Sequence, residues 1–256
     1  MGRVVAIANQ KGGVGKTTTA VNLGASLAVA EQRVLLVDLD PQGNASTGVG
    51  LAPGTVDQGT YQVLLGEAPI AEVIRPSELP QLDVVASTPD LAAGELELVD
   101  TDDRMTRLRD AIVSVRDRYD FVVVDCPPSL GLLTLNALVS ADLVVVPLQC
   151  EYYALEGLSQ LVRTIERVRG SLNPGLALHG VLLTMFDARN RLANEVAAEV
   201  REHFHVYDTV IPRNIRLAEA PSHGKPVILY DAASRGSYGY LNLAREILDA
   251  LPEAAA

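Results

Sequence analysis

Short, continuous apolar runs recur along the chain. They cover residues 4–8, 34–37, 82–85, 121–124, 143–146, 180–183 and 209–211, and they are rich in β-branched side chains. Continuous runs, unlike alternating ones, are typical of strands whose two faces are both buried, as in a parallel sheet. The pattern therefore predicts a central, mostly parallel sheet that is covered on both sides.

Helical periodicity fills the gaps between these runs. In residues 153–169 apolar side chains recur at helix spacing, and Glu156, Arg163 and Arg167 fall on the opposite face. Strands that alternate with helices predict a doubly wound α/β fold, with helices flanking the sheet. Further helices are predicted over residues 16–30, 103–117, 130–140, 190–203 and 239–251.

The domain organisation is predicted to be simple. Prolines punctuate residues 50–90, which favours connecting loops and short helices over a separate domain. We expect residues 1–256 to form one domain, with a frayed tail over 252–256. Because the chain begins at the first predicted strand, we expect neither a signal peptide nor an N-terminal helix-turn-helix domain.

Composition and charge narrow the function classes. The chain is 48% hydrophobic and 21% charged, as in ordinary globular proteins. No apolar run reaches the roughly 18–20 residues of a membrane-spanning helix. The formal net charge of −11 argues against a surface that is basic throughout, but residues 211–240 carry a net charge of +2. Cys126 and Cys150 end apolar runs, and we expect both to be buried and reduced.

Lysine is scarce in this chain. Of the 21 basic residues 18 are arginine, and the lysines are Lys11, Lys16 and Lys225. Two of the three lie in one six-residue loop. Lysine is a compact point charge and arginine a wide planar fork. A lysine in a chain that otherwise uses arginine therefore suggests a position where the guanidinium group does not fit.

The stretch N-Q-K-G-G-V-G-K-T-T follows the first apolar run and opens a predicted helix. Its glycines let backbone N–H groups approach phosphate oxygens, and the helix N-terminus adds positive potential. We expect Lys16 to reach the β- and γ-phosphates and the Thr17 hydroxyl to bind Mg²⁺. The usual spacing, G-x-x-x-x-G-K-[ST], would place a glycine at position 10. This chain has Gln10 there, followed by a second lysine, Lys11.

Two predicted strands end in aspartate. R-V-L-L-V-D-L-D brings Asp38 to the end of one strand with Asp40 just past it, and F-V-V-V-D brings Asp125 to the end of another. A single aspartate there could merely cap a helix or form a turn. Ligands of parallel α/β sheets, however, bind beyond the carboxyl ends of the strands. Beside a phosphate loop, Asp125 fits a carboxylate that holds Mg²⁺ through water, and Asp40 fits one that orients the attacking water or touches the metal.

These motifs resemble a known family. K-G-G-V-G-K-T-T looks like the deviant Walker A loop of a group of dimeric P-loop ATPases. That loop is shared with the septum-site protein MinD, nitrogenase iron protein and arsenite-pump ATPases. Together with L-L-V-D-L-D-P-Q-G-N, D-C-P-P-S-L-G, Q-C-E-Y-Y-A-L-E-G-L and I-P-R-N-I-R-L-A-E-A-P-S-H-G-K-P, it closely resembles the ParA/Soj chromosome-partition ATPases over about residues 2–250.

The resemblance implies that two subunits sandwich two ATP molecules. Lys16 would contact its own nucleotide and Lys11 the partner's, while Gly12 would stay small at the crowded interface. Two facing triphosphates leave excess negative charge, which a lysine supplied by the partner offsets. Asp40 would serve hydrolysis. The implied nucleotide contacts are Lys11, Gly12, Gly13, Val14, Gly15, Lys16, Thr17, Thr18 and, for adenine, Asn214, whose amide offers a donor and an acceptor.

The family's output is non-specific binding of duplex DNA by the ATP-bound homodimer. By resemblance Arg189 and Arg216 match DNA-contacting arginines, and Lys225 and Arg235 are further candidates in the basic segment. An isolated surface arginine is more often solvated or ion-paired. With no Trp and three Phe, phosphate contact rather than base stacking is expected. The resemblance also implies a ParB-type centromere-binding partner that stimulates slow hydrolysis, and a cytoplasmic, nucleoid-associated location.

Two other classes stay open. One is a metabolic P-loop enzyme, such as an ATP-dependent ligase of the dethiobiotin synthetase kind. The other is a MinD-like positioning ATPase. MinD relatives end in a basic amphipathic helix that binds membranes. The tail here is acidic, so no membrane partner is expected. ATP turnover that responds to a small acid rather than to DNA would favour the metabolic class.

Overall fold

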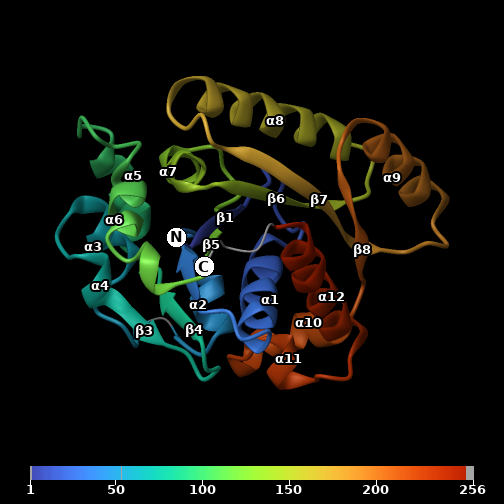
Figure 1. Cartoon of the computed structure of the whole chain (residues 1–256), viewed down its shortest axis with the longest axis horizontal. Coiled ribbons are helices and arrows are strands. Elements are labelled where there is room, and N and C mark those ends of the chain that lie inside the picture. Colours follow the sequence, from blue (N-terminus) through green and yellow to red (C-terminus); the bar gives the residue numbers. More distant parts are fainter. Residues whose placement is uncertain (1, 53, 252–256) are drawn as a thin grey trace.

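The computed structural model describes residues 2–52 and 54–251. At its centre is an eight-stranded sheet in the order β3-β4-β2-β5-β1-β6-β7-β8 (Figure 1). Every neighbouring pair is parallel except β3 and β4, so the doubly wound, mostly parallel fold predicted from the sequence is confirmed. The strands are β1 (Arg3–Ile7), β2 (Val34–Asp38), β3 (Ile74–Pro76), β4 (Leu82–Val85), β5 (Phe121–Asp125), β6 (Leu143–Gln149), β7 (Ala177–Phe186) and β8 (Val206–Pro212).

Helices cover both faces of this sheet. The longer ones are α1 (Lys16–Val29), α8 (Ala154–Ser171), α9 (Arg191–His203) and α12 (Arg235–Ala250). The shorter ones are α2 (Asn44–Gly48), α3 (Thr60–Leu65), α4 (Ile70–Val73), α5 (Leu91–Leu98), α6 (Arg107–Val113), α7 (Leu132–Ser140), α10 (Ile215–Glu219) and α11 (Val227–Tyr230), with 3₁₀ turns at Arg116–Arg118 and Ala220–His223.

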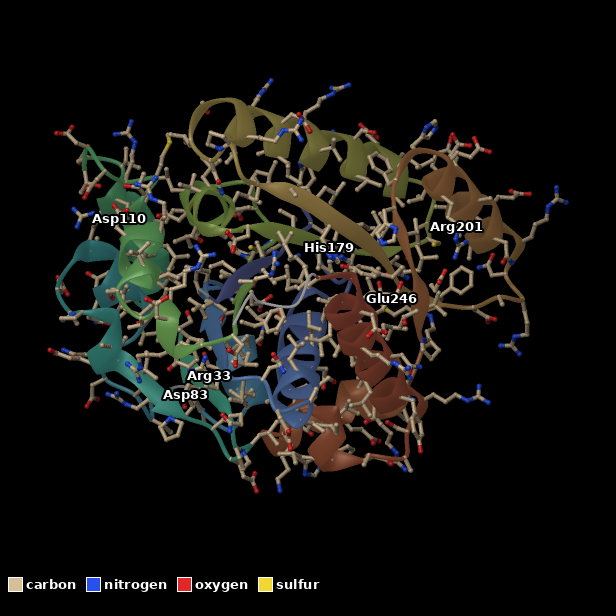
Figure 2. The ribbon with its side chains drawn as sticks, viewed as in Figure 1. Arg33, Asp83, Asp110, His179, Arg201 and Glu246 are labelled. Carbon is tan, nitrogen blue, oxygen red and sulfur yellow. The ribbon has the colours of Figure 1, made fainter. Side chains whose placement is uncertain are left out.

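The pleat of each strand divides the core in two. Successive side chains of a strand point to opposite faces. In β1, Val4 and Ala6 join the core under α6, α7, α8 and α9, whereas Val5 and Ile7 join the core under α1 and α12. Figure 1 shows α8 and α9 on one side of the sheet and α1 and α12 on the other. In Figure 2, Asp110 of α6 and Arg201 of α9 lie near opposite ends of the molecule.

Parallel pairing brings the chemically interesting loops to one edge. The loop after β1 lies between those that follow β5 and β6, because β1 pairs with both strands. In the register of β2 and β5, Asp38 stands opposite Asp125. The phosphate-loop sequence and both aspartate-ended strands therefore meet at the carboxyl edge of the sheet, as expected for this architecture.

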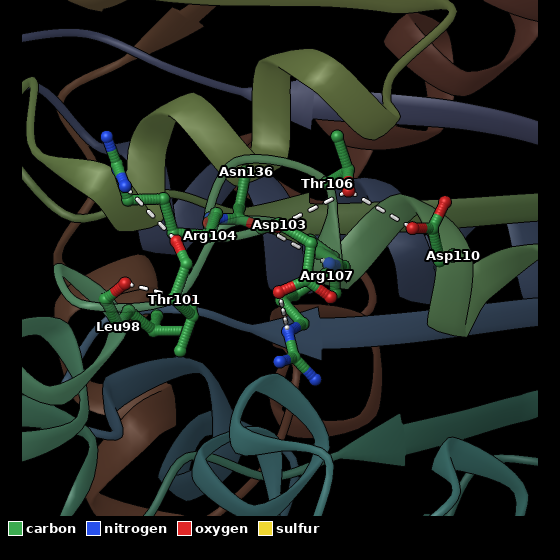
Figure 3. A network of polar contacts seen from close by, with 9 residues as sticks. Leu98, Thr101, Asp103, Arg104, Thr106, Arg107, Asp110 and Asn136 are labelled. Carbon is green, nitrogen blue, oxygen red and sulfur yellow. Dashed lines mark hydrogen bonds and ion pairs between the residues drawn. The ribbon is translucent and has the colours of Figure 1, made fainter.

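A polar network fastens the segment before α6 to α7 (Figure 3). The buried Asn136 donates from Nδ2 to the carbonyls of Arg104 (2.6 Å) and Leu132 (2.9 Å). Its Oδ1 accepts from the backbone N–H of Leu108 at 3.2 Å. The bonds to Arg104 and Leu108 join α7 to backbone groups at and just before the start of α6. They hold residues 104–108 against the helix that follows the Asp125 loop.

Several boundaries differ from those predicted. The helix expected over 103–117 is α6 plus a 3₁₀ turn, because the anchored residues before Arg107 form turns. The helix expected to begin at 239 begins at Arg235, because Ser234 accepts a hydrogen bond from the Ser237 N–H as its N-cap. Both cysteines are buried and free, as predicted. The predicted frayed tail, 252–256, lies outside the described residues.

Candidate functional site

The loop after β1 closes into a phosphate-binding conformation. Gly13 and Gly15 adopt φ values of 75° and 89°, which only glycine takes readily, and Gly15 is the N-cap of α1. The backbone N–H groups at the start of α1 are thereby left free for an anion. The carbonyl of Val14 accepts a hydrogen bond from the Thr184 hydroxyl at 2.8 Å, which ties the loop to β7.

Lys16 is buried at the first position of α1. Its Nζ donates to the carbonyl of Lys11 at 3.0 Å, so it already spans the loop. Burial lowers the pKa of the Lys16 ammonium, and the nearby carboxylates of Asp125 and Asp40 oppose that shift. A bound phosphate would add negative charge beside the ammonium and so oppose the effect of burial on its pKa. The position and environment of Lys16 thus fit the predicted phosphate contact.

A cavity of about 490 Å³ opens beside this loop. That volume lies within the range of roughly 300–1,000 Å³ typical of small-molecule sites. Its lining comes from the loops after β1, β2 and β5, from the starts of α1 and α2, from the carboxyl ends of β7 and β8, and from α10 and α12. The lining residues are Gly12, Gly13, Gly15, Lys16, Thr17, Thr18, Asp40, Gln42, Asn44, Pro128, Thr184, Met185, Ile211, Pro212, Asn214, Leu217, Ala218 and Tyr240.

Three aspartates line or underlie this cavity. Asp38 accepts from Ser46 through both Oγ (2.7 Å) and N–H (2.8 Å), and from the Asp40 N–H at 3.1 Å. Burial outweighs these bonds and raises the pKa of Asp38 to about 6. Asp40 is nearly buried, accepts from the Gln42 N–H at 3.0 Å, and reaches the cavity. Asp38 therefore fixes the turn that presents Asp40.

Asp125 is fully buried, and neither carboxylate oxygen accepts a hydrogen bond of standard geometry from the described residues. Burial and the charge of Asp38 hold the pKa of Asp125 well above its usual range, only partly opposed by Thr17 and Lys16. A buried carboxylate without partners is costly unless a cation or ordered water meets it. With Thr17 close by, the donor set is one that Mg²⁺ and its water ligands suit. The residues thus fit a magnesium site.

Lys11 behaves differently from Lys16. It is absent from the cavity lining, and its Nζ instead forms an ion pair with Glu151, just past β6. Gly12, its neighbour, does line the cavity, and a Cβ built on Gly12 would meet no atom within 4 Å. Within one subunit, therefore, nothing in the described residues requires Gly12 to be small. Val14 is also absent from the cavity lining, and its predicted nucleotide contact stays a prediction.

Asn214 reaches the far wall of the cavity from the N-cap of α10. Its Oδ1 accepts from the Arg216 N–H at 2.8 Å. This bond uses one of the two lone pairs of Oδ1, so the amide keeps an acceptor site and its NH₂ group for a base. The predicted contact with adenine, through a donor and an acceptor of this amide, therefore stays a prediction.

The predicted DNA-contacting residues separate into two settings. Arg189 has a side chain that is 90% exposed and pairs with Asp187 at 3.0 Å, which lowers the pKa of Asp187 to about 2. Arg216 pairs with Glu219 (2.8 Å) and Asp231 (3.1 Å). Both follow the carboxyl ends of neighbouring strands, β7 and β8.

Lys225 pairs with Glu78 at 3.4 Å and lines a second cavity, of about 280 Å³, that shares Thr17, Thr18 and Asn44 with the first. Arg235 is exposed at the first turn of α12. Neither is brought into the ion-pair groups of Arg189 or Arg216 among the described residues. Their assignment to DNA stays a prediction.

Several residues in or beside the cavity were not identified as site residues from the sequence. Thr184 and Met185 form the wall beside the phosphate loop, and Met185 has a φ of 49°, rare for a residue with a side chain. Tyr240 reaches the cavity from α12 and shares a hydrogen bond with Thr19 at 3.1 Å. Asn9 donates from Nδ2 to the carbonyl of Pro147 at 2.7 Å, joining the loops after β1 and β6. Asn9 does not line the cavity itself, and it lies within the phosphate-loop motif that the sequence identified.

The model of the AAA domain family matches residues 2–178. The chain is 58% identical to the chromosome partitioning protein ParA of Caulobacter vibrioides, over 96% of this chain and 94% of that one. It is 56% identical to the sporulation initiation inhibitor protein Soj of Bacillus subtilis, over 96% and 98% of the two chains.

Solved structures share the fold. A cobyrinic acid a,c-diamide synthase from Mycobacterium smegmatis, with bound ATP analog and magnesium, superposes with a TM-score of 0.85 at 36% identity, over 97% of this chain and 95% of that one. The cell division ATPase MinD of Pyrococcus furiosus superposes with a TM-score of 0.83 at 28% identity, over 98% and 100% of the two chains.

Proposed function

This chain belongs to the ParA/Soj family of chromosome-partitioning ATPases, and from that premise we propose that it is an ATP-driven dimerisation switch that segregates DNA. The proposal depends chiefly on the different placement of two lysine side chains. Lys16 is buried at its own phosphate loop, whereas Lys11 points out of the cavity that the loop lines. A lysine at the loop that does not face its own nucleotide site is available to a partner's.

The cavity supports MgATP as the ligand. Gly12 to Thr18 would hold the phosphates, Thr17 and Asp125 would hold Mg²⁺ with its water ligands, and Asn214 would donate to adenine. Bound Mg²⁺ supplies positive charge that stabilises the phosphates as their negative charge shifts during hydrolysis. Asp40, held in place by Asp38, would orient the attacking water or accept its proton.

DNA binding would follow from pairing two weakly basic surfaces. The chain carries a net charge of −11, so one subunit should bind a polyanion poorly. Arg189 lies in the loop after β7 and Arg216 in α10, which follows the adjacent strand β8, and dimerisation would double their number. Both arginines are held by carboxylates, so DNA phosphates would have to compete with those partners. We therefore expect weak, non-specific and strongly salt-dependent binding.

The remaining parts of the proposal follow the family. We infer that residues 1–256 act as one ATPase domain, in the cytoplasm at the nucleoid, with a ParB-type protein that stimulates hydrolysis. None of the helices within residues 2–52 and 54–251 is long and apolar enough to cross a membrane.

Co-sedimentation with long duplex DNA tests the proposal. Binding should require ATP, be absent with ADP or no nucleotide, and fall steeply as salt rises. Lys16→Ala and Arg189→Glu should each abolish or greatly weaken it. Arg245→Glu is the matched control, because Arg245 is also exposed and ion-paired but lies in the later half of α12. Unchanged binding by Lys16→Ala or Arg189→Glu would overturn the proposal.

A metabolic role is the second candidate, favoured by the 36% identity to a diamide synthase. It predicts ATP turnover that depends on a carboxylic acid and a nitrogen donor. Measuring phosphate release with DNA, or with a panel of small acids plus ammonia, separates the two classes. Stimulation by the acids alone would favour the metabolic one.

A further inference from the structure

Lys11 is held by a carboxylate of its own subunit. Its Nζ pairs with Glu151, and the two side chains are 38% and 47% exposed. Glu151 follows β6, the strand that lies beside β1 in the sheet, so the two loops leave the same edge together. The pair therefore bridges the phosphate loop to the loop that precedes α8.

The bases of these loops are fixed, so the pair is not a chance meeting of two mobile side chains. Asn9 donates from Nδ2 to the Pro147 carbonyl at 2.7 Å, and its Oδ1 accepts from the Lys11 N–H at 3.0 Å. One asparagine thus ties the backbone of Lys11 to the end of β6. The side-chain pair with Glu151 extends that tie by a few residues.

We propose that Glu151 is a positioning residue for Lys11, which holds the Lys11 ammonium in its own subunit until it is exchanged for the nucleotide of a partner. This inference rests on the proposed dimerisation. Lys11 must leave Glu151 to reach phosphates across an interface, because one ammonium on one stem serves one position at a time. Glu151 thus opposes pairing in the absence of nucleotide and yields to the greater negative charge of a triphosphate.

Nucleotide binding also acts on the backbone of Lys11. The Lys16 Nζ donates to the Lys11 carbonyl at 3.0 Å. When Lys16 donates to phosphate instead, the Lys11 carbonyl loses this hydrogen bond. The backbone at the entrance of the loop is then less constrained. Occupancy of a subunit's own site is thereby linked to the freedom of the lysine that it offers to its partner.

The size of the effect follows from the exposure of the pair. Half-exposed ion pairs change an equilibrium constant by a factor of about two to five. A two-fold dimer would break two such pairs, so the factors multiply. Removing the Glu151 charge should therefore tighten the ATP-dependent dimer by roughly 4- to 25-fold.

The dimer constant is measured by sedimentation with a non-hydrolysable ATP analogue for wild type, Glu151→Gln and Glu156→Gln. Glu156 lies five residues further on, is exposed, and makes no ion pair among the described residues, so it controls for the loss of one negative charge. Glu151→Gln should dimerise at lower protein concentration than either, with unchanged monomer affinity for ADP. Equal or weaker dimerisation of Glu151→Gln relative to Glu156→Gln would overturn the inference.

A second measurement does not depend on dimerisation. The three lysines of the chain can be followed separately by amine acylation and peptide mass mapping in nucleotide-free protein. Glu151→Gln should raise the labelling rate of Lys11 and leave Lys225 unchanged. Unchanged labelling of Lys11 would also overturn the inference. If Lys11 labelling rises but even wild type fails to dimerise with ATP, the proposed function fails while the pairing of Lys11 by Glu151 stands.

Discussion

Asp38 and Asp125 lie opposite each other in the register of β2 and β5, and both side chains are fully buried. The first accepts three hydrogen bonds, whereas the second accepts none of standard geometry from the described residues. One carboxylate therefore organises the loop after β2, and its neighbour is left to meet a cation. Two buried acids at adjacent positions also make the stability of the metal-free protein depend on pH.

In metal-free protein the free energy of unfolding should fall as pH rises from about 4 to above 6. The pKa of Asp38 is raised from 3.8 to about 6, and that of Asp125 is raised well above 3.8. Over this window the folded state holds more protons than the unfolded chain, so raising the pH favours unfolding. Each pKa unit corresponds to about 1.4 kcal/mol. Urea unfolding with a chelator, at several pH values, measures the slope.

Asp125→Asn is the informative comparison. It removes one buried acid and the repulsion between that acid and Asp38. The slope of the unfolding free energy against pH should therefore flatten, and the metal-free protein should be more stable at pH 7. Burial lowers the pKa of His179, on β7 near Glu246 of α12 (Figure 2), and this works in the opposite sense. Taking the difference between wild type and variant cancels that contribution. A slope as steep in Asp125→Asn as in wild type would contradict the assignment.

Asp40→Ala should bind MgATP but hydrolyse it at least about 100-fold more slowly, as expected when a group that activates water is removed. The carboxylate touches the cavity, and its own backbone is held by Asp38, so the fold should survive. The variant should accumulate as an ATP-bound dimer on DNA. Sizing chromatography with ATP checks this, and a monomer would count against the role of Asp40.

Lys11→Ala should lose ATP-driven dimerisation while its ATP affinity changes by less than about threefold, because Lys11 does not line its own cavity. Lys16→Ala should lose ATP affinity itself. Nucleotide titration and sizing, run on both variants, separate the two roles. Gly12→Val offers an independent probe: a Cβ there meets no atom within 4 Å, so the monomer should fold and dimerisation should fail. Equal loss of ATP affinity in Lys11→Ala and Lys16→Ala would refute the division.

Asn214→Asp should weaken ATP binding by about three- to tenfold, the usual value of one hydrogen bond. An aspartate retains the oxygen that accepts from the Arg216 N–H and remains a good N-cap, but it loses the NH₂ donor. The melting temperature should therefore stay within a degree or two of wild type. Asn214→Ala, which loses cap and donor together, should lower both affinity and stability. An unaltered affinity in Asn214→Asp would exclude the donor role.

Arg216→Glu and Arg189→Glu should reduce DNA affinity. Each should also lower the salt slope by about one unit for every DNA phosphate that the arginine neutralises in the wild type. Lys225→Glu should act less, because Lys225 lines a different cavity and shares no ion pair with Arg189 or Arg216 among the described residues. Filter binding at several salt concentrations ranks the variants. A larger effect of Lys225→Glu than of Arg189→Glu would move the DNA surface toward the second cavity.

Local signals in the sequence predicted most of the sheet and the phosphate loop. The apolar runs located the cores of β1, β2 and β5, because strands buried on both faces leave little choice of residue. They did not predict the antiparallel β3, which is three residues long and partly exposed. Nor did they predict α5, whose Leu96 is 75% exposed and blurs the helical pattern.

The parts of the site that the sequence missed depend on distant pairs. Thr184 reaches the Val14 carbonyl across 170 positions, and Lys11 reaches Glu151 across 140. No local pattern encodes either contact, because each arises from the order of strands in the sheet. The Asn214 cap was missed for a different reason: the motif identified the residue, but only the helix that follows shows that its side chain also caps α10.

The cap of α10 links the predicted adenine contact, Asn214, to a predicted DNA contact, Arg216, through one hydrogen bond. A base that draws on the Asn214 amide pulls on the group whose oxygen holds the Arg216 N–H. The nucleotide and the DNA surface would then communicate over two residues of chain, and not through the body of the sheet. In that arrangement a small rotation of α10 would be enough to change the direction of the Arg216 side chain relative to a DNA phosphate.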